Sequence, residues 1–482
     1  MKSILGMLFF LMLHVVQGQE YPKGILPGVD PDYDNLPEKA VLTRNFYDSN
    51  PSAYSLKRYA PYPGSQSPYG TCTGWAVAYT ARTILEAQKN GWTNRDYITE
   101  NAFSPLYQYR VNSDNSNCRG AFTSEVVASL KNVGSVPMKS FTFSGGDELC
   151  PTVPVPSANH NIAELYKIEE YTRLWSSGAS AEQKIQRTKT SIASGNPVVI
   201  SANCPSSMSR LTSEGLWDPT EDPDDNHGGH AICVVSYDDF KFGGAFEVQN
   251  SWGTNYGLGG YFWVKYEDYA EWIYQAFELV QFLPPEPVEP ILAGSLRMFD
   301  LDDQQDLEVT LAAKNRNWNW YREENDEELY TYKVNANLLS GSEMRMYIES
   351  EQSAFVYMLG TGEVDRSVAQ LFPVDGISPA LNYLNSEIAL PSENHYFKMD
   401  NTTGKNYIIL LFSRNKLNIE SIKERFANAS GNVGRRLKSA TEGLLMPSEY
   451  VEFDSEAIGF SVQQNDSGKN AFAMIVQFNQ VD

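Results

Sequence analysis

Cysteine and histidine are the side chains of this sequence that are best suited to nucleophilic chemistry, and it contains five of each. A thiol attacks as its thiolate, and a helix amino terminus or a neighbouring imidazolium lowers the thiol pKa. Cys72 directly precedes a segment, residues 73–89, whose apolar residues recur at helical spacing. The other cysteines lie in loop-like sequence or in and beside apolar strand-like runs: Cys118, Cys150, Cys204 and Cys233. Cys72 is therefore the predicted nucleophile.

A thiol nucleophile needs a base, and the sequence context of the histidines favours His230. His230 follows two glycines and opens a strand-like run, 230–237, which would place its ring at a strand edge beside a cleft. His227 is interpreted as a solvated loop residue. Asn250 follows twenty residues after His230, and its amide oxygen could accept a hydrogen bond from the ring and select its tautomer. The indole of Trp252 could shield that hydrogen bond from water, which would strengthen it.

The sequence also indicates the elements that must position these residues. After the helix at 73–89, a second helix is predicted from Ala181 to Ile192, because Ser180 and Gln183 form the pattern of a capping box. Short β-like runs then follow in close order, at 197–202, 230–237, 245–250 and 261–266. A helical part followed by a sheet is an α+β arrangement.

Three separated motifs resemble those of the papain-like (C1-type) cysteine peptidase family, in the family's order. The first is a Gln six positions before the nucleophile, here in Gln66-Ser67-Pro68-Tyr69-Gly70-Thr71-Cys72. The second is a His-Ala strand start, here in Gly229-His230-Ala231. The third is an Asn-Ser-Trp-Gly run, here Asn250-Ser251-Trp252-Gly253. The resemblance covers about residues 55–280. It implies two lobes, one helical and one a β-barrel-like sheet, with the active site in the cleft between them.

The resemblance also implies roles for individual residues. Gln66 would donate its side-chain amide to an oxyanion hole, together with the backbone N–H of Cys72. His230 would protonate the leaving amine and then activate the water that hydrolyses the acyl-enzyme. Gly120 lies in a run that loosely resembles the family's Cys-Asn-Gly-Gly wall, and it would contact the substrate backbone.

Two departures from the family pattern flank the predicted nucleophile. Thr73 stands where the family usually has Trp, and Tyr69 stands where it usually has a cysteine, so one common family disulfide cannot form. A different bridge, between Cys118 and Cys150, is expected. Residues 19–71 are too few for the family's long helical inhibitory pro-segment, so activation by removal of one is not expected, although their first part could cover the cleft.

Hydropathy and proline content divide the chain into five parts. A charged start, an apolar run and a small residue at its end predict a cleavable signal peptide, and therefore a secreted or periplasmic protein. No later stretch reaches the roughly 18 uninterrupted apolar residues of a membrane span. The predicted parts are a signal peptide at 1–18, an extended arm at 19–54, the peptidase domain at 55–282, a Pro-rich linker at 283–290 and an accessory domain at 291–482.

The accessory domain has regularly spaced strand-like runs and one predicted helix at about 419–440, a pattern typical of a β-sandwich. Within it, residues 344–415 resemble an accessory β domain of unknown function from bacterial envelope proteins, on the strength of the runs at 354–358, 371–373 and 390–391. That resemblance implies an envelope or surface partner.

The formal net charge of −22 argues against nucleic acid or an anionic membrane as a partner, because both would repel such a surface.

The predicted function is a secreted cysteine endopeptidase that acts on protein or peptide substrates through a Cys-His-Asn triad, with no metal or cofactor. Two alternatives stay open. One is a catalytically silent papain-like module that binds peptide or glycan, and the other is a cell-wall peptide amidase with the same chemistry. The presence of nucleophile, base, orienting residue and oxyanion donor favours an active enzyme.

Overall fold

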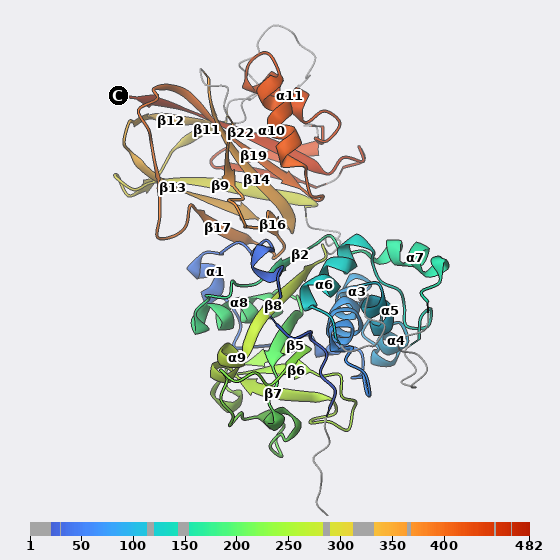
Figure 1. The fold of residues 1–482 in the computed structure, drawn as a ribbon. Coiled ribbons are helices and arrows are strands. Elements are labelled where there is room, and N and C mark those ends of the chain that lie inside the picture. The colour runs from blue at the N-terminus through green and yellow to red at the C-terminus, as the bar shows by residue number, and fades with distance from the viewer. Residues whose placement is uncertain are drawn as a thin grey trace, which may run out of the picture.

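The structure is a computed structural model that describes residues 21–28, 30–112, 120–142, 154–282, 290–311, 332–363, 368–447, 450–463 and 465–482. The predicted signal peptide, nearly all of the predicted linker and both cysteines of the predicted bridge, Cys118 and Cys150, lie outside the described residues. Figure 1 shows an α+β part with a mainly β part stacked on one end of it. Among the described residues, no helix combines the length and apolar character needed to cross a bilayer.

One unbroken helical run begins at Cys72 and forms the centre of the helical lobe. It consists of α2 (Cys72–Gly74), η3 (Trp75–Arg82) and α3 (Thr83–Lys89), and this confirms the predicted helix. The middle segment is a π-helix whose residues are all buried, and π-helical turns are frequent near functional sites. The neighbouring helices are α4 (Arg95–Glu100), α5 (Pro105–Arg110), α6 (Thr123–Asn132), α7 (Ser157–Ala163) and the short η4 (Glu164–Tyr166).

The other lobe is an eight-stranded sheet with the order β2-β8-β3-β5-β6-β7-β4, in which β1 also pairs with β5. Its strands are β1 (Ala53–Ser55), β2 (Glu170–Arg173), β3 (Val198–Asn203), β4 (Leu216–Trp217), β5 (Gly229–Asp238), β6 (Ala245–Gln249), β7 (Tyr261–Lys265) and β8 (Ile273–Val280). The four predicted strands are confirmed as β3, β5, β6 and β7. Shorter elements around the sheet are α9 (Tyr266–Trp272), η5 (Ser206–Ser209) and η6 (Lys241–Gly243).

Helix α8 (Ala181–Ala193) begins where the capping box predicts. The Gln183 N–H donates to Ser180 Oγ at 3.3 Å, and the Ser180 N–H donates to Gln183 Oε1 at 2.9 Å. Two backbone donors at the helix start are thereby satisfied by local sequence alone.

The mainly β part consists of two sheets, one ordered β17-β13-β9-β21-β20 and the other β11-β12-β22-β19-β14-β15. The first contains β9 (Leu292–Asp300), β13 (Glu343–Ser350), β17 (Ser386–Leu390), β20 (Val451–Phe453) and β21 (Ile458–Val462), with β10 (Gln305–Asp306) and β18 (Phe397–Lys398) at its side. The second contains β11 (Val309–Leu311), β12 (Tyr332–Leu339), β14 (Ala354–Gly362), β15 (Ala369–Phe372), β19 (Gly404–Ser413) and β22 (Ala471–Val481), with β16 (Ala380–Leu381) beside β14. Apolar side chains from both sheets form one buried cluster, which is the packing of a sandwich.

The prediction of one continuous helix at 419–440 is wrong, because the helix is interrupted. The structure has two helices, α10 (Ile419–Asn428) and α11 (Val433–Ala440). Gly431 between them has a φ of +105°, a backbone conformation that breaks a helix, and the Asn432 side chain accepts a hydrogen bond from the Arg435 N–H to start α11. The two helices cover the face of the second sheet that points away from the first (Figure 1).

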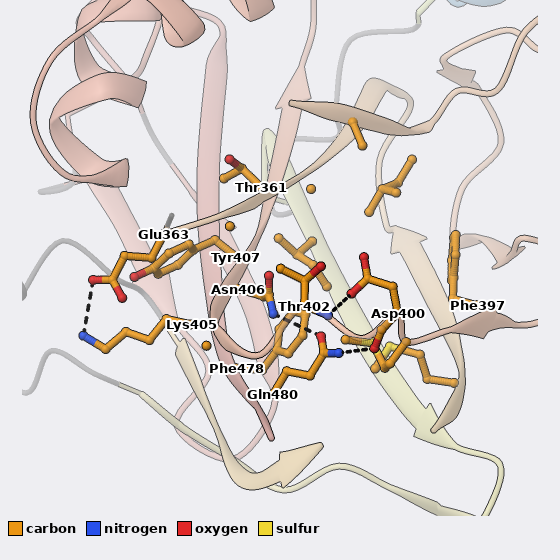
Figure 2. A pocket seen from close by; sticks show the side chains of 18 of the residues that line it. Thr361, Glu363, Phe397, Asp400, Thr402, Lys405, Asn406, Tyr407, Phe478 and Gln480 are labelled. Atoms are coloured by element: carbon orange, nitrogen blue, oxygen red, sulfur yellow. Dashed lines mark hydrogen bonds and ion pairs between the residues drawn. The ribbon is translucent and has the colours of Figure 1, made fainter. Parts of the chain in front are cut away.

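A pocket of about 310 Å³ lies within the mainly β part (Figure 2). Phe397, Phe478 and methionines of β13 contribute apolar surface to it. At its rim, Gln480 Nε2 donates to the Asp400 carbonyl oxygen at 2.5 Å, and Asn406 Nδ2 donates to Gln480 Oε1 at 3.3 Å.

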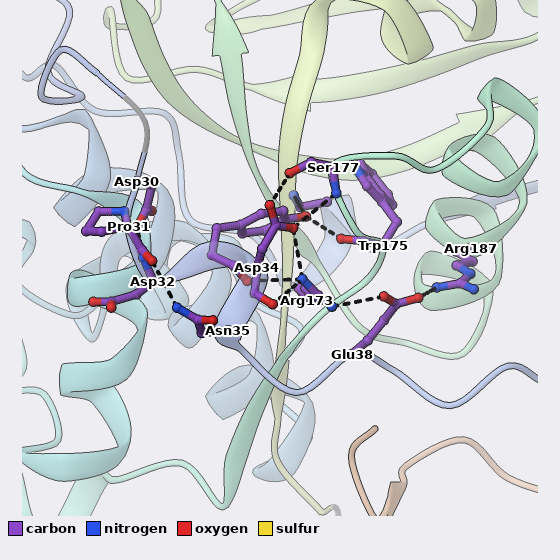
Figure 3. A network of polar contacts seen from close by, with 12 residues as sticks. Asp30, Pro31, Asp32, Asp34, Asn35, Glu38, Arg173, Trp175, Ser177 and Arg187 are labelled. Atoms are coloured by element: carbon purple, nitrogen blue, oxygen red, sulfur yellow. Dashed lines mark hydrogen bonds and ion pairs between the residues drawn. The ribbon is translucent and has the colours of Figure 1, made fainter. Parts of the chain in front are cut away.

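The amino-terminal arm contains the short elements η1 (Tyr33–Asn35) and α1 (Arg44–Asp48), and ion pairs anchor it to the sheet lobe. The short element η2 (Lys57–Tyr59) follows the arm. Arg173 contacts Asp34 at 2.9 Å and Glu38 at 3.3 Å, and Arg187 contacts Glu38 at 2.5 Å (Figure 3). Ser177 Oγ also donates to Asp34 at 2.6 Å. The arm is thus held firmly at residues 34–38, downstream of the segment that enters the cleft.

Candidate active site

The structure brings His230 and Asn250 into direct contact. His230 lies in β5 and Asn250 directly follows β6, and these two strands are neighbours in the sheet. His230 Nε2 lies 2.8 Å from Asn250 Oδ1, and the Ser251 N–H donates to the same oxygen at 2.7 Å. Because a backbone N–H can only donate, Oδ1 is an acceptor, and the proton of that contact sits on His230 Nε2. The other ring nitrogen, Nδ1, has no hydrogen-bond partner among the described residues and is left as the acceptor.

Cys72 lies against the start of the same strand. Its sulfur accepts a hydrogen bond from the Ala231 N–H at 3.3 Å, one residue beyond His230. Cys72 opens α2, so the helical run places the thiol at the beginning of β5, where the histidine lies. The predicted nucleophile and base, which are far apart in the sequence, therefore meet at the junction of the two lobes.

Gln66 is fully buried next to them, and its amide is oriented from both ends. The Ser251 hydroxyl donates to Gln66 Oε1 at 2.6 Å, which leaves Nε2 as the donor. Nε2 donates to the carbonyl oxygens of Tyr69 at 2.9 Å and of Pro22 at 3.1 Å. The sequence reasoning assigned no role to Ser251, although it lies within the Asn-Ser-Trp-Gly motif and so could have been found there.

Trp252 and Gly120 both lie beside these residues. The Trp252 indole stacks on the His230 ring, with centroids 4.7 Å apart and an interplanar angle of 20°, and is only 6% exposed. Gly120 has a φ of +146°, and a Cβ there would lie 3.0 Å from the Gly24 carbonyl oxygen. The neighbouring Ala121 N–H donates to that oxygen at 3.1 Å. Gly120 thus contacts a peptide backbone in the cleft, but that peptide is the protein's own arm.

The arm fills the cleft over the thiol. Tyr21 stacks on Trp252 with centroids 4.5 Å apart, and the Pro22 carbonyl oxygen accepts from Trp252 Nε1 at 3.2 Å as well as from Gln66. The Gly24 N–H faces the Cys72 sulfur. A Cβ on Gly24 would lie 2.3 Å from the Gly70 carbonyl oxygen, so only glycine fits at this position. The sequence left open whether the arm covers the cleft, and in the structure it does.

Burial controls the protonation of the site. Burial raises the pKa of the Cys72 thiol to about 12, against a smaller lowering by the backbone N–H groups of Ala231, Thr73 and Gly24. Burial likewise lowers the pKa of His230 to about 4, with the Asn250 hydrogen bond opposing the shift and the charge of Lys23 adding to it. The thiol and the imidazole are therefore both neutral in this state. The expected thiolate does not form here, because loss of water outweighs the field of the helix amino terminus.

The sequence model of the family described as "Papain family cysteine protease" matches residues 70–276. This range contains the thiol, the histidine and the asparagine whose contacts are described above. Residues 70–276 are a papain-family cysteine protease domain. The predicted fold class is confirmed, with a papain-like α+β catalytic region followed by a mainly β region.

Two curated relatives resemble this papain-family domain. The chain is 26% identical over 211 residues to "Uncharacterized peptidase C1-like protein L477" of Acanthamoeba polyphaga mimivirus, covering 43% of this chain and 65% of that protein. It is 24% identical over 199 residues to Cysteine proteinase 2 of Entamoeba histolytica, covering 41% of this chain and 57% of that protein. The chain thus spans less than two thirds of the length of either relative.

Solved structures similar to this chain include xylellain, a cysteine protease from Xylella fastidiosa. That match has 23% identity and a TM-score of 0.44, and it covers 55% of this chain and 98% of xylellain. Another is the ragweed pollen allergen Amb a 11, a cysteine protease in its proform, with 19% identity, a TM-score of 0.39 and coverage of 50% of this chain and 70% of that one.

Proposed function

We propose that this protein is a secreted cysteine endopeptidase that hydrolyses peptide bonds through Cys72, His230 and Asn250. The observation that carries the proposal is the tautomer of His230. Asn250 holds the proton on Nε2, and Nδ1 has no hydrogen-bond partner among the described residues. A neutral imidazole with an acceptor nitrogen beside a thiol is the arrangement that nucleophilic catalysis requires.

The chemistry follows from these contacts. His230 Nδ1 takes the proton of the Cys72 thiol, and the sulfur attacks the carbonyl carbon of the scissile bond. The oxygen that gains negative charge accepts hydrogen bonds from Gln66 Nε2 and the Cys72 N–H. The imidazolium then protonates the leaving amine, the C–N bond breaks, and an acyl-enzyme remains. Water, deprotonated by His230, cleaves the thioester and restores the thiol.

The arm must leave the cleft before a peptide can bind, because the two need the same space. In the arm-filled state the Gly24 N–H faces the Cys72 sulfur, and Gln66 Nε2 donates to the Pro22 carbonyl oxygen, so groups needed for the reaction are occupied by the arm. Movement of the arm would also admit water to the thiol and the imidazole. Removal of the burial that keeps both groups neutral favours formation of the thiolate-imidazolium pair.

The test is labelling of the reduced full-length chain with a thiol-reactive peptidyl epoxide, followed by location of the adduct. The expected result is an adduct on Cys72, and loss of both labelling and peptide hydrolysis in Cys72→Ala. No adduct on Cys72, even in a variant that displaces the arm, would sink the proposal. An adduct without hydrolysis of any peptide would favour the silent binding module, and hydrolysis restricted to cell-wall peptides would favour the amidase.

Export is proposed from residues 1–18, whose pattern is that of a signal peptide. Protein collected from the medium or periplasm should begin at about Gln19, as determined by amino-terminal sequencing. For the accessory domain the proposal stays that of an envelope or surface partner. Within the part of the chain that the structure describes, no group of three or more His, Cys, Asp or Glu side chains is placed to hold a metal ion.

A further inference from the structure

A cation-binding site lies beside the thiol, and the arm occupies it in this structure. Lys23 Nζ donates to the carbonyl oxygen of Cys204 at 2.7 Å and to that of His227 at 2.5 Å. Both carbonyl groups are far from Lys23 in the sequence, and both accept hydrogen bonds from its ammonium group. We name this pair of carbonyl groups the carbonyl cradle.

The backbone around the carbonyl cradle is held independently of Lys23. The Cys204 N–H donates to the Gly228 carbonyl oxygen at 2.9 Å, which continues the pairing of β3 with β5. The His227 N–H donates to Asn203 Oδ1 at 3.0 Å, and His227 Nε2 lies 2.8 Å from the Asp222 carbonyl oxygen. The two oxygens therefore keep their positions when Lys23 leaves, and a preformed site binds a new donor with little reorganisation.

Shape and charge both favour a basic side chain in the carbonyl cradle. Gly228 leaves room for the stem of the side chain, since a Cβ there would lie 3.3 Å from Lys23 Cδ. Glu221 carries a fixed negative charge near Cys204. Its slight burial would raise its pKa, but hydrogen bonds from Ser207, Ser206 and Thr220 lower the value to about 2. Asp218, Asp222, Asp224 and Asp225 lie in the same loop and increase the negative potential.

The position of the carbonyl cradle relates it to the scissile bond. On either side of Lys23, Pro22 contacts Gln66, and Gly24 faces Cys72. The carbonyl cradle also lies close enough to His230 for the charge of Lys23 to act on the imidazole. His230 serves the leaving amine in the proposed mechanism, so a side chain in the carbonyl cradle belongs to the leaving-group side of the substrate.

We propose that the carbonyl cradle is a substrate subsite that selects a lysine or arginine side chain at the residue following the scissile bond. This inference rests on the proposed peptidase function and adds a substrate class to it. Lys23 is then the internal occupant of a subsite that a basic residue of the substrate fills after the arm leaves. The selectivity favours a cation, because two carbonyl oxygens offer only acceptors, and an ammonium or guanidinium group donates to both whereas an apolar side chain donates to neither.

The first experiment measures the affinity of the carbonyl cradle without any need for hydrolysis. The rate of Cys72 alkylation by iodoacetamide in the full-length chain reports how often the arm opens. Lys23→Met keeps the length of the side chain and removes its charge, and it should raise the rate by about tenfold, as expected for a lost charge-assisted hydrogen bond. Lys23→Arg should stay near the wild-type rate. Equal rates for Lys23→Met and wild type would overturn the proposal.

The second experiment measures selection of the substrate. Lys23→Met protein is given matched peptides with Lys or Met directly after the scissile bond, and kcat/KM is compared. The expected preference for Lys is about tenfold, and Glu221→Gln should reduce it severalfold while an exposed control, Glu182→Gln, leaves it unchanged. Equal hydrolysis of both peptides would overturn the proposed subsite but not the proposed peptidase function. Failure to hydrolyse any peptide would instead overturn the proposed function, and the substrate subsite with it.

Discussion

At the scale of single residues, Ser251 connects the two halves of the site. Its N–H donates to Asn250 Oδ1 at 2.7 Å, and its hydroxyl donates to Gln66 Oε1 at 2.6 Å. One residue thereby helps to orient both the amide that holds His230 and the amide proposed to stabilise the oxyanion. Neither amide is positioned by its own strand or helix alone.

Ser251→Ala should lower kcat by about tenfold with little change in KM, because the lost hydroxyl frees Gln66 to turn its amide away from the oxyanion. The backbone N–H to Asn250 is retained, so the His230 tautomer is unaffected. Steady-state kinetics on a peptide substrate check this prediction, and Ser213→Ala, a change at an exposed serine, serves as the control. A rise in KM with kcat unchanged would contradict the assigned role.

The lowered pKa of His230 predicts acid sensitivity. The folded pKa of about 4 lies below the ordinary histidine pKa of 6.5, so the unfolded chain binds a proton more readily. The contribution to stability is complete above pH 6.5 and is lost as the pH falls toward 4, and at most it amounts to about 3 kcal/mol. The measurement is the free energy of unfolding between pH 7 and pH 4 for wild type and His230→Gln.

The difference between the two proteins isolates His230 from other titrating groups. Asp268 acts in the opposite direction, since burial raises its pKa to about 6 and its contribution is lost as the pH rises. His230→Gln should show a smaller loss of stability on acidification than wild type. Parallel pH curves for the two proteins would argue against a buried, neutral histidine.

At the scale of elements, the arm at residues 21–25 controls access to the thiol. It binds through stacking on Trp252 and through backbone hydrogen bonds, such as that from the Ile25 N–H to the Gly229 carbonyl oxygen at 3.2 Å. None of these contacts is covalent, and ion pairs at Asp34, Glu38 and Lys39 anchor the arm further along the chain. The segment can therefore detach while the rest of the arm stays bound.

Gly24→Val should displace the arm, because a Cβ would lie 2.3 Å from the Gly70 carbonyl oxygen. Overpacking of this kind costs about 1–3 kcal/mol, so Cys72 alkylation should accelerate by about tenfold or more. The measurement is the alkylation rate at neutral pH, with Pro27→Ala at an exposed arm position as the matched control. An unchanged rate in Gly24→Val would mean that the arm does not limit access.

At the scale of the whole molecule, one buried carboxylate joins the arm, the catalytic domain and the accessory domain. Glu278 in β8 contacts Lys39 of the arm at 3.0 Å and accepts from Ser191 of α8 at 2.6 Å. It also accepts from Asn382 Nδ2 at 2.7 Å and from the Tyr383 hydroxyl, both in the accessory domain. Burial alone would raise the pKa of Glu278, but Lys39 and these donors outweigh it and hold the pKa below its ordinary value.

Glu278→Gln should lower the free energy of unfolding by about 3–5 kcal/mol, because the Lys39 ammonium loses its counterion while it stays buried. The double variant with Lys39→Met should recover part of that loss. Thermal and denaturant unfolding provide the measurement, with Glu442→Gln at an exposed site as the control. Equal stability of Glu278→Gln and wild type would show that the pair is not charged in the folded protein.

The sequence predicted the local parts of this architecture well. The helix that begins at Cys72, the capping box of α8 and the four strands around His230 all rest on patterns within a few residues, which neighbouring chain segments do not alter. Strand β9, in contrast, escaped prediction although it is central to its sheet, because Gly294 and Ser295 interrupt its apolar run. The break between α10 and α11 was missed because helical periodicity continues across Gly431.

The sequence by itself determined which residues could form the catalytic constellation, because the chemistry requires a thiol, an imidazole and an amide in recognisable local contexts. Only the tertiary structure decided what surrounds them. The arm lies over Cys72, Lys23 fills the carbonyl cradle, and Glu278 joins three parts of the molecule through contacts between residues up to 239 positions apart. Such contacts leave no local pattern, since their free energy depends on burial and geometry that exist only once the distant segments have packed together.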